Sequence, residues 1–185
     1  MTSVTRVKDG RRWLLGSAAD VAWIEGAIDF SASLVTEVPP VFAAYCRLEL
    51  PDDAPDAQAR HDKAIVELLS ADSGPQPWWL GYLEYGSGIA RVFGDTPRTR
   101  LFGWDFVLVQ AGAEQALGWR SSSAPDLDWK GALPDLIFHA DHSWMLFTSW
   151  DDRWSGIGGP EELIARITRD PEVGPRTQRL PGPYG

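Results

Sequence analysis

The chain contains 185 residues, of which 44% are hydrophobic and 23% charged, and its 26 acidic and 17 basic residues give a formal net charge of −9. This composition is typical of a globular domain that buries its own core. The acidic excess argues against nucleic acids and anionic membranes as ligands, because proteins bind their phosphates mainly through basic side chains.

The same composition bears on the cellular compartment. Cys46 is the only cysteine, which excludes a disulfide framework and a cysteine metal cluster. No apolar run approaches the roughly 20 residues that span a bilayer, and the apolar run at 13–15 is too short for a signal peptide. We therefore expect a cytoplasmic protein, and the preference for arginine over lysine predicts a bacterial source with a GC-rich genome.

Hydrophobic periodicity predicts an alternation of strands and helices. In chain order we expect two short strands within 4–15, a helix at 18–29, a strand at 44–50, a helix at 57–70, strands at 78–86 and 103–110, a short helix at 113–119, a surface loop at 120–134, strands at 135–138, 144–150 and 154–158, and a helix that starts at Pro160.

Local signals refine these elements. Asp56 precedes the helix at 57–70 and is predicted to be its N-cap. His61 lies among charged residues of that helix, so we expect it to be exposed. The strands at 78–86 and 103–110 are apolar on both faces, which is typical of strands in the middle of a covered sheet.

Together the elements predict an α+β fold, with a mostly antiparallel sheet of about five to seven strands and three or four helices packed on it. We assign residues 1–173 to a single domain. Residues 174–185 are rich in proline, glycine and arginine, and we expect them to form a C-terminal tail that lies over the body of the domain.

Four segments carry a resemblance to known proteins: VPPVFAAYCRLELP, WWLGYLEYG, GWDFVLVQAGAEQA and LPDLIFHADHSWMLFTSWDDRWSGIGGPEELIARI. In their order, from about residue 38 to 173, the chain resembles a bacterial family of uncharacterised proteins of similar length. In its acidic, tryptophan-rich character it is also similar to the SUKH immunity superfamily. Those α+β proteins bind and neutralise toxins, often nucleases, so this second resemblance implies a protein-binding role.

The segment HADHSW, residues 139–144, is the part of the chain that most resembles a chemical site. His139, Asp141 and His142 could bind zinc or iron. On an extended strand, however, the two histidines would point to opposite faces, and Asp141 could instead cap a turn by accepting a backbone amide hydrogen bond. The resembling family typically has P-A-D-R-x-W here, which matches Asp141 and Trp144 but neither histidine. We expect no cofactor, and keep the metal site as an alternative.

A second alternative is a small hydrolase-like enzyme. Glu84 and Asp105 lie inside otherwise apolar strands, and burial would raise the pKa of a carboxyl group for acid–base catalysis. If their strands are neighbours, they could form a pair and act with Asp141. Each could instead bind an arginine, such as Arg91. Arg98 and Arg100 in the following loop could hold an anion or simply be solvated.

The remaining signal is aromatic. Most of the ten tryptophans lie on or beside predicted strands, Trp104 among them, and should belong to the core. Trp119 and Trp129 lie near the polar loop and are predicted to be exposed as binding anchors. With Asp151 and Asp152 in a hairpin turn, they favour a non-enzymatic module that binds a basic partner protein.

Overall fold

The computed structural model of the protein describes residues 4–8, 10–28, 37–52, 56–84, 93–123, 131, 133–149 and 152–182. In these ranges the chain forms ten strands and four α-helices. The strands are β1 (Val4–Lys8), β2 (Arg11–Leu15), β3 (Ala44–Glu49), β4 (Trp78–Leu83), β5 (Thr99–Leu101), β6 (Trp104–Ala111), β7 (Leu136–His139), β8 (Met145–Thr148), β9 (Trp154–Gly159) and β10 (Thr177–Leu180). The helices are α1 (Ala18–Ala27), α2 (Ala57–Ser73), α4 (Ala113–Ser123) and α5 (Glu161–Arg169), with a short 3₁₀ helix, η1 (Gly174–Arg176).

All ten strands belong to one sheet, in the order β1-β2-β6-β4-β7-β8-β9-β3-β10, with β5 beside β6. Every described pair is antiparallel. The α+β class is therefore confirmed, but the sheet has more strands than the five to seven predicted. The prediction missed β5 and β10, which have three and four residues and lack a clear apolar alternation.

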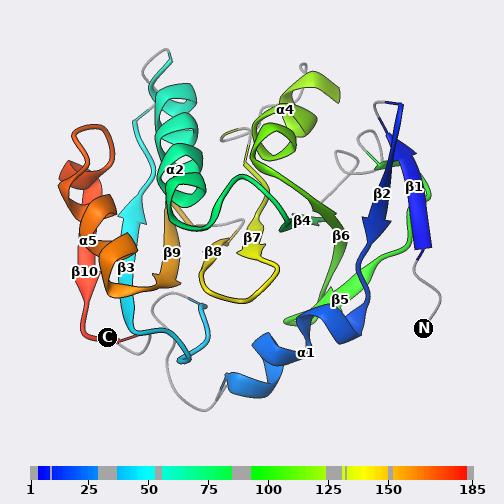
Figure 1. The fold of residues 1–185 in the computed structure, drawn as a ribbon, viewed down its shortest axis with the longest axis horizontal. Helices are drawn as coiled ribbons and strands as arrows, with labels where there is room; N and C mark the ends of the chain where they lie inside the picture. The colour runs from blue at the N-terminus through cyan, green and yellow to red at the C-terminus, as the bar shows by residue number, and fades with distance from the viewer. Residues whose placement is uncertain are drawn as a thin grey trace.

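The helices cover the two faces of the sheet unequally. Figure 1 shows α2 and α4 above the sheet, α5 beside β3 and β10 at its left end, and α1 below it. The buried residues of α5 belong to the same core as those of α2. α5 illustrates why a helix forms and docks here: Pro160 precedes it, two glutamates occupy its first turn, and Leu163, Ile164 and Ile167 are buried. No described helix combines the length and the apolar character needed to cross a bilayer.

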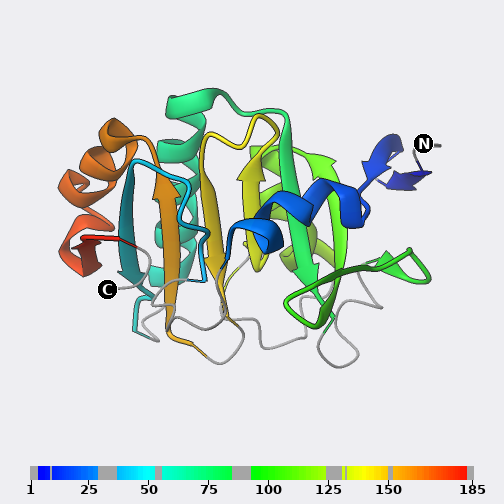
Figure 2. The ribbon, with the colours of Figure 1, turned by 90° about the horizontal axis from the view of Figure 1, so that it is seen from below.

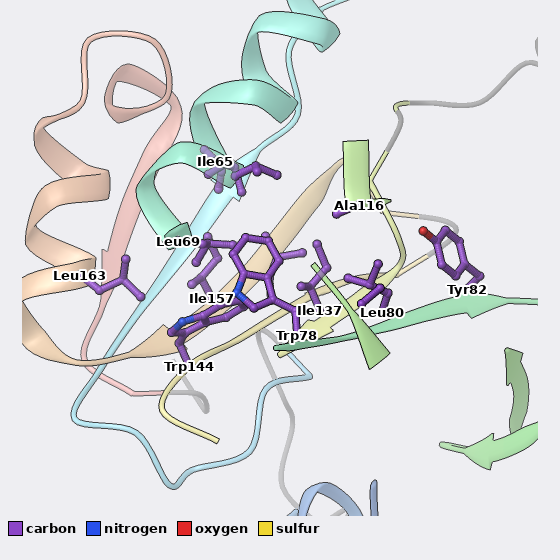
Figure 3. Packing of buried hydrophobic residues seen from close by; sticks show 14 of the residues in the cluster. Ile65, Leu69, Trp78, Leu80, Tyr82, Ala116, Ile137, Trp144, Ile157 and Leu163 are labelled. Atoms are coloured by element: carbon purple, nitrogen blue, oxygen red, sulfur yellow. The ribbon is translucent and has the colours of Figure 1, made fainter. Parts of the chain in front are cut away.

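The core on the three-helix face contains two fully buried tryptophans (Figure 3). Trp78 and Trp144 meet edge to face, with ring centroids 5.0 Å apart. Trp78 Nε1 donates to the carbonyl oxygen of Gly74 (3.0 Å), and Trp144 Nε1 donates to Ser73 Oγ (2.6 Å). Both indole N–H groups are thus satisfied, as buried tryptophans require, and they join the sheet to the C-terminal end of α2.

On the opposite face, α1 lies across the strands (Figure 2). Val21, Ile24 and Ile28 point into a second core that contains Trp79, Phe138 and other side chains of the sheet. The same core includes Val38, from the segment that precedes β3. Trp78 and Trp79, which are adjacent in β4, are therefore buried on opposite faces of the sheet. The prediction that this strand is central and covered on both faces is confirmed.

One prediction about α2 was wrong. His61 is only 2% exposed, not solvated, because it lies one helical turn before Ile65 and so shares its buried face. Asp56 is the N-cap residue of α2, as predicted, although its φ is 63° and its side chain makes no capping hydrogen bond.

The C-terminal segment after residue 173 is partly built into the sheet. β10 pairs with β3, and Arg179 forms an ion pair with Glu161 of α5. Arg176 Nη2 also contacts His61 Nδ1 at 3.2 Å. Likewise, α4 continues to Ser123, so the first residues of the surface loop predicted at 120–134 are helical.

Candidate functional site

The connection between β7 and β8 is a tight turn stabilised by Asp141. The N–H of His142 donates to the carbonyl oxygen of His139 (2.9 Å), and His142 adopts a left-handed φ of 64°. Asp141 Oδ1 accepts the backbone N–H of Ser143 at 2.8 Å. The predicted role of Asp141 as the residue that caps this turn is confirmed.

His139 and Asp141 form a close pair within the turn. Asp141 Oδ1 lies 2.6 Å from Nδ1 of His139, whose side chain is largely buried. Burial would raise the pKa of Asp141, but hydrogen bonds from Ser143 and His139 outweigh it and lower the pKa to about 2. The carboxylate is thus ionised at neutral pH, and Nδ1 is the donor in the pair. His139 Nε2 is buried and has no hydrogen-bond partner among the described residues.

The ring of His142 stacks on Trp23 of α1. Its ring lies 4.4 Å from that of Trp23, with an interplanar angle of 15°. The described part of the chain holds no group of three or more histidine, cysteine, aspartate or glutamate side chains arranged to bind a metal. The alternative of a metal site at His139, Asp141 and His142 is therefore not supported, because the turn directs the two imidazoles to different partners.

The stack continues into an apolar patch beside α1. Trp23 meets Phe42 edge to face, with centroids 6.2 Å apart, and Val41 next to it is 55% exposed. The backbone of Phe42 is held in place, because its N–H donates to Tyr45 Oη (2.8 Å). The segment that carries Val41 and Phe42 lies beside α1 in Figure 2, drawn in light blue.

The β5–β6 hairpin places an exposed tryptophan on the α1 side. Trp104 is 46% exposed, and its parity along β6 matches that of the buried Phe106 and Leu108, which face α1. The turn before it is anchored, since the N–H of Phe102 donates to Glu25 Oε1 of α1 (3.1 Å) and its ring meets Phe147. We refer to Trp23, Val41, Phe42, Trp104 and His142 together as the α1 surface.

Glu84, which directly follows β4, lies opposite Asp105 of β6, but each of these two carboxylates of the hydrolase alternative binds an arginine. Glu84 accepts two hydrogen bonds from Arg98, at 2.8 and 3.0 Å. Asp105 contacts Arg100 at 3.3 Å. The hydrogen bond from Arg98 is the main cause that lowers the pKa of Glu84, the opposite of the shift that acid catalysis needs. These ion pairs also occupy Arg98 and Arg100, the two arginines of the possible anion site.

Asp141 cannot act with these carboxylates. The register pairs Trp78, the first residue of β4, with His139, whereas Glu84 follows the last residue of that strand. Six residues at about 3.3 Å each separate the two ends by roughly 20 Å. The predicted catalytic group is therefore divided between opposite ends of the sheet.

The predicted binding residues have different outcomes. Trp119 is 3% exposed and packs edge to face against Trp13 and Phe93, so its predicted exposure was wrong. Asp152 is half-buried in the β8–β9 connection. Trp129 and Asp151 lie outside the described residues.

Sequence reasoning missed the α1 surface because it assigned Trp104 to the core and gave no role to Trp23 or Val41. One signal was available: Trp104 follows directly on Gly103, whose φ of 80° belongs to the hairpin turn. A strand residue beside such a turn is at the end of the sheet, where fewer neighbours cover it.

Comparisons of this chain with protein-family models, with curated proteins and with solved structures found no match.

Proposed function

We propose that this chain is a non-enzymatic binding module of the bacterial cytoplasm that recognises a basic partner protein through the α1 surface. One observation carries the proposal. Of the large hydrophobic side chains in the described residues, only Val41 and Trp104 are strongly exposed, and both lie on the side of the sheet that α1 covers. Exposed apolar groups gathered on one face are a usual mark of a protein interface.

The chemistry of the α1 surface supports this role. Tryptophan and other aromatic residues contribute most to binding when a partner excludes water from them. The hydrogen bonds from Phe102 to Glu25 and from Phe42 to Tyr45 fix the backbone next to Trp104 and Val41. A surface held in this way loses little conformational entropy on binding.

Charge supports a basic partner. The formal net charge of −9 would speed the encounter with a positively charged protein and disfavour acidic ones. The similarity to the SUKH immunity superfamily extends the proposal to an immunity-like role, in which the partner would be a basic toxin and the bound complex its neutralised form.

Affinity capture from a lysate of the bacterial host, followed by binding measurements with the purified partner, tests the proposal. We expect one basic protein to be recovered, and Trp104→Ala and Val41→Asp to weaken its binding at least tenfold. Ala59→Asp, which adds the same charge at an exposed site on α2, is the matched control and should leave binding unchanged. A partner that binds Val41→Asp as tightly as the wild type, or the absence of any stable partner, would contradict the proposal.

A further inference from the structure

The outer end of the β7–β8 turn brings an aromatic stack and a carboxylate together on the surface. His142 is exposed while one face of its ring lies on Trp23, at 4.4 Å. Asp141 is adjacent in the chain, and its side chain is 63% exposed. Burial lowers the pKa of His142, and the charge of Asp141 opposes this shift.

The carboxylate of Asp141 is oriented by its neighbours. Oδ1 accepts hydrogen bonds from His139 Nδ1 (2.6 Å) and from the Ser143 N–H (2.8 Å). The side chain of Ser143 also interacts with this carboxylate. These contacts orient the carboxylate, while the Asp141 side chain remains exposed to solvent and so to a ligand.

We propose that His142, Trp23 and Asp141 form a recognition site for the guanidinium group of an arginine side chain of the partner protein. The planar cation would stack on the exposed face of His142 while its N–H groups donate to the carboxylate of Asp141. The inference rests on the proposed function, since it names the side chain that the α1 surface would select.

The geometry favours arginine over lysine. A guanidinium group is planar, stacks on ring faces and presents several donors at once, whereas an ammonium group is a compact and strongly hydrated point charge. A neutral imidazole stacks on a cation without charge repulsion, and burial lowers the pKa of His142, which favours the neutral ring. The carboxylate of Asp141 is ionised at pH 7, because its pKa is about 2.

The peptide acetyl-Arg-Arg-Arg-amide, titrated into the isotopically labelled full-length protein at pH 7, is a suitable probe. We expect the largest saturable shifts at the His142 ring and the Trp23 indole, weaker binding of the tri-lysine peptide and no binding of the uncharged tri-citrulline peptide. Asp141→Asn and His142→Asn should each weaken binding at least threefold, and asparagine tolerates the left-handed backbone at position 142. Asp95→Asn removes an exposed charge elsewhere and should change binding by less than 1.5-fold.

Equal effects of Asp141→Asn and Asp95→Asn would overturn the inference, because they would show attraction to net charge alone. So would tri-citrulline binding as well as tri-arginine, or the absence of shifts at His142 and Trp23. The result is separable from that of the capture experiment. If a captured partner binds the Asp141→Asn and His142→Asn variants as tightly as the wild type, the protein-binding function stands and the arginine site is refuted. If tri-arginine binds specifically but no partner is captured, the site is supported and the protein-binding function is refuted.

Discussion

Glu84 and Asp105 face each other across the β4–β6 pair, where the Glu84 N–H donates to the carbonyl oxygen of Asp105 at 2.8 Å. Two carboxylates in such positions could share a proton and so raise one pKa. Here each side chain instead binds its own arginine, from the loop and strand that precede β6. The arrangement neutralises a like-charge pair and argues for a structural role of both carboxylates.

The two ion pairs should differ in strength. Arg98 and Glu84 are partly buried and joined by two hydrogen bonds, whereas Arg100 and Asp105 are more exposed and farther apart. In a double-mutant cycle with Glu84→Gln and Arg98→Gln we expect a coupling free energy of about 1 kcal/mol. The cycle with Asp105→Asn and Arg100→Gln should give a coupling free energy of roughly 0.3 kcal/mol. Urea unfolding at pH 7 measures both, and equal couplings would refute the distinction.

The Glu84 coupling should also depend on pH. The folded-state pKa of Glu84 lies below its ordinary value of 4.5, so its stabilising effect is fully present above that pH and is lost as the pH falls below it. Repeating the cycle at pH 2.5 should therefore give a smaller coupling than at pH 7. A coupling that is unchanged in acid would mean that the ion pair does not cause it.

The buried side chain of His61 should make the folded protein less stable in acid. Burial, reinforced by the charge of Arg176 and opposed by that of Glu172, lowers the pKa of His61 from 6.5 to about 4. The unfolded chain therefore binds more protons than the folded protein between these values, and stability falls as the pH falls through this window. The full shift corresponds to at most about 3 kcal/mol.

The test of this prediction is the variant His61→Gln, which cannot titrate. Urea unfolding of the wild type at pH 7 and pH 4.5 should show a loss of stability that the variant lacks in large part. If both proteins lose the same free energy, other groups are responsible for the acid sensitivity and His61 is not.

Trp119 and Trp104 should behave in opposite ways. Trp119 is buried against Trp13 and Phe93, so Trp119→Ala should destabilise the fold by about 3–5 kcal/mol. Trp104→Ala removes a side chain that is 46% exposed and should cost less than about 1 kcal/mol. Thermal unfolding of the two variants measures this difference. A stable Trp119→Ala variant would show that the aromatic cluster around α4 is not part of the core.

The sequence predicted most of this fold because its signals were local. β4 was readable as a covered central strand from apolar residues on both parities, and the β7–β8 turn from Asp141. Burial of His61 and Trp119 was missed because His61 lies between charged residues and a polar segment follows Trp119. Each nevertheless lies on the same helix face as an apolar residue, Ile65 and Ala116 respectively. Helical spacing was the better guide than sequence neighbourhood.

The candidate site was harder to predict because it depends on contacts between distant segments. Nothing in the sequence near His142 indicates that its ring lies on Trp23, more than a hundred residues earlier. The same is true of β10, a short polar strand whose place is set by its pairing with β3. Contacts of this kind follow from the strand order of the whole sheet, which no local pattern encodes.

Site-directed photocrosslinking in the bacterial host tests the central proposal most directly. The photoreactive residue p-benzoylphenylalanine would replace either Trp104, on the α1 surface, or Glu67, which is exposed on α2 at the opposite face. Irradiation should join the protein substituted at position 104 to one discrete basic protein and give no such product at position 67. Equal products from both positions, or none from position 104, would contradict recognition through the α1 surface.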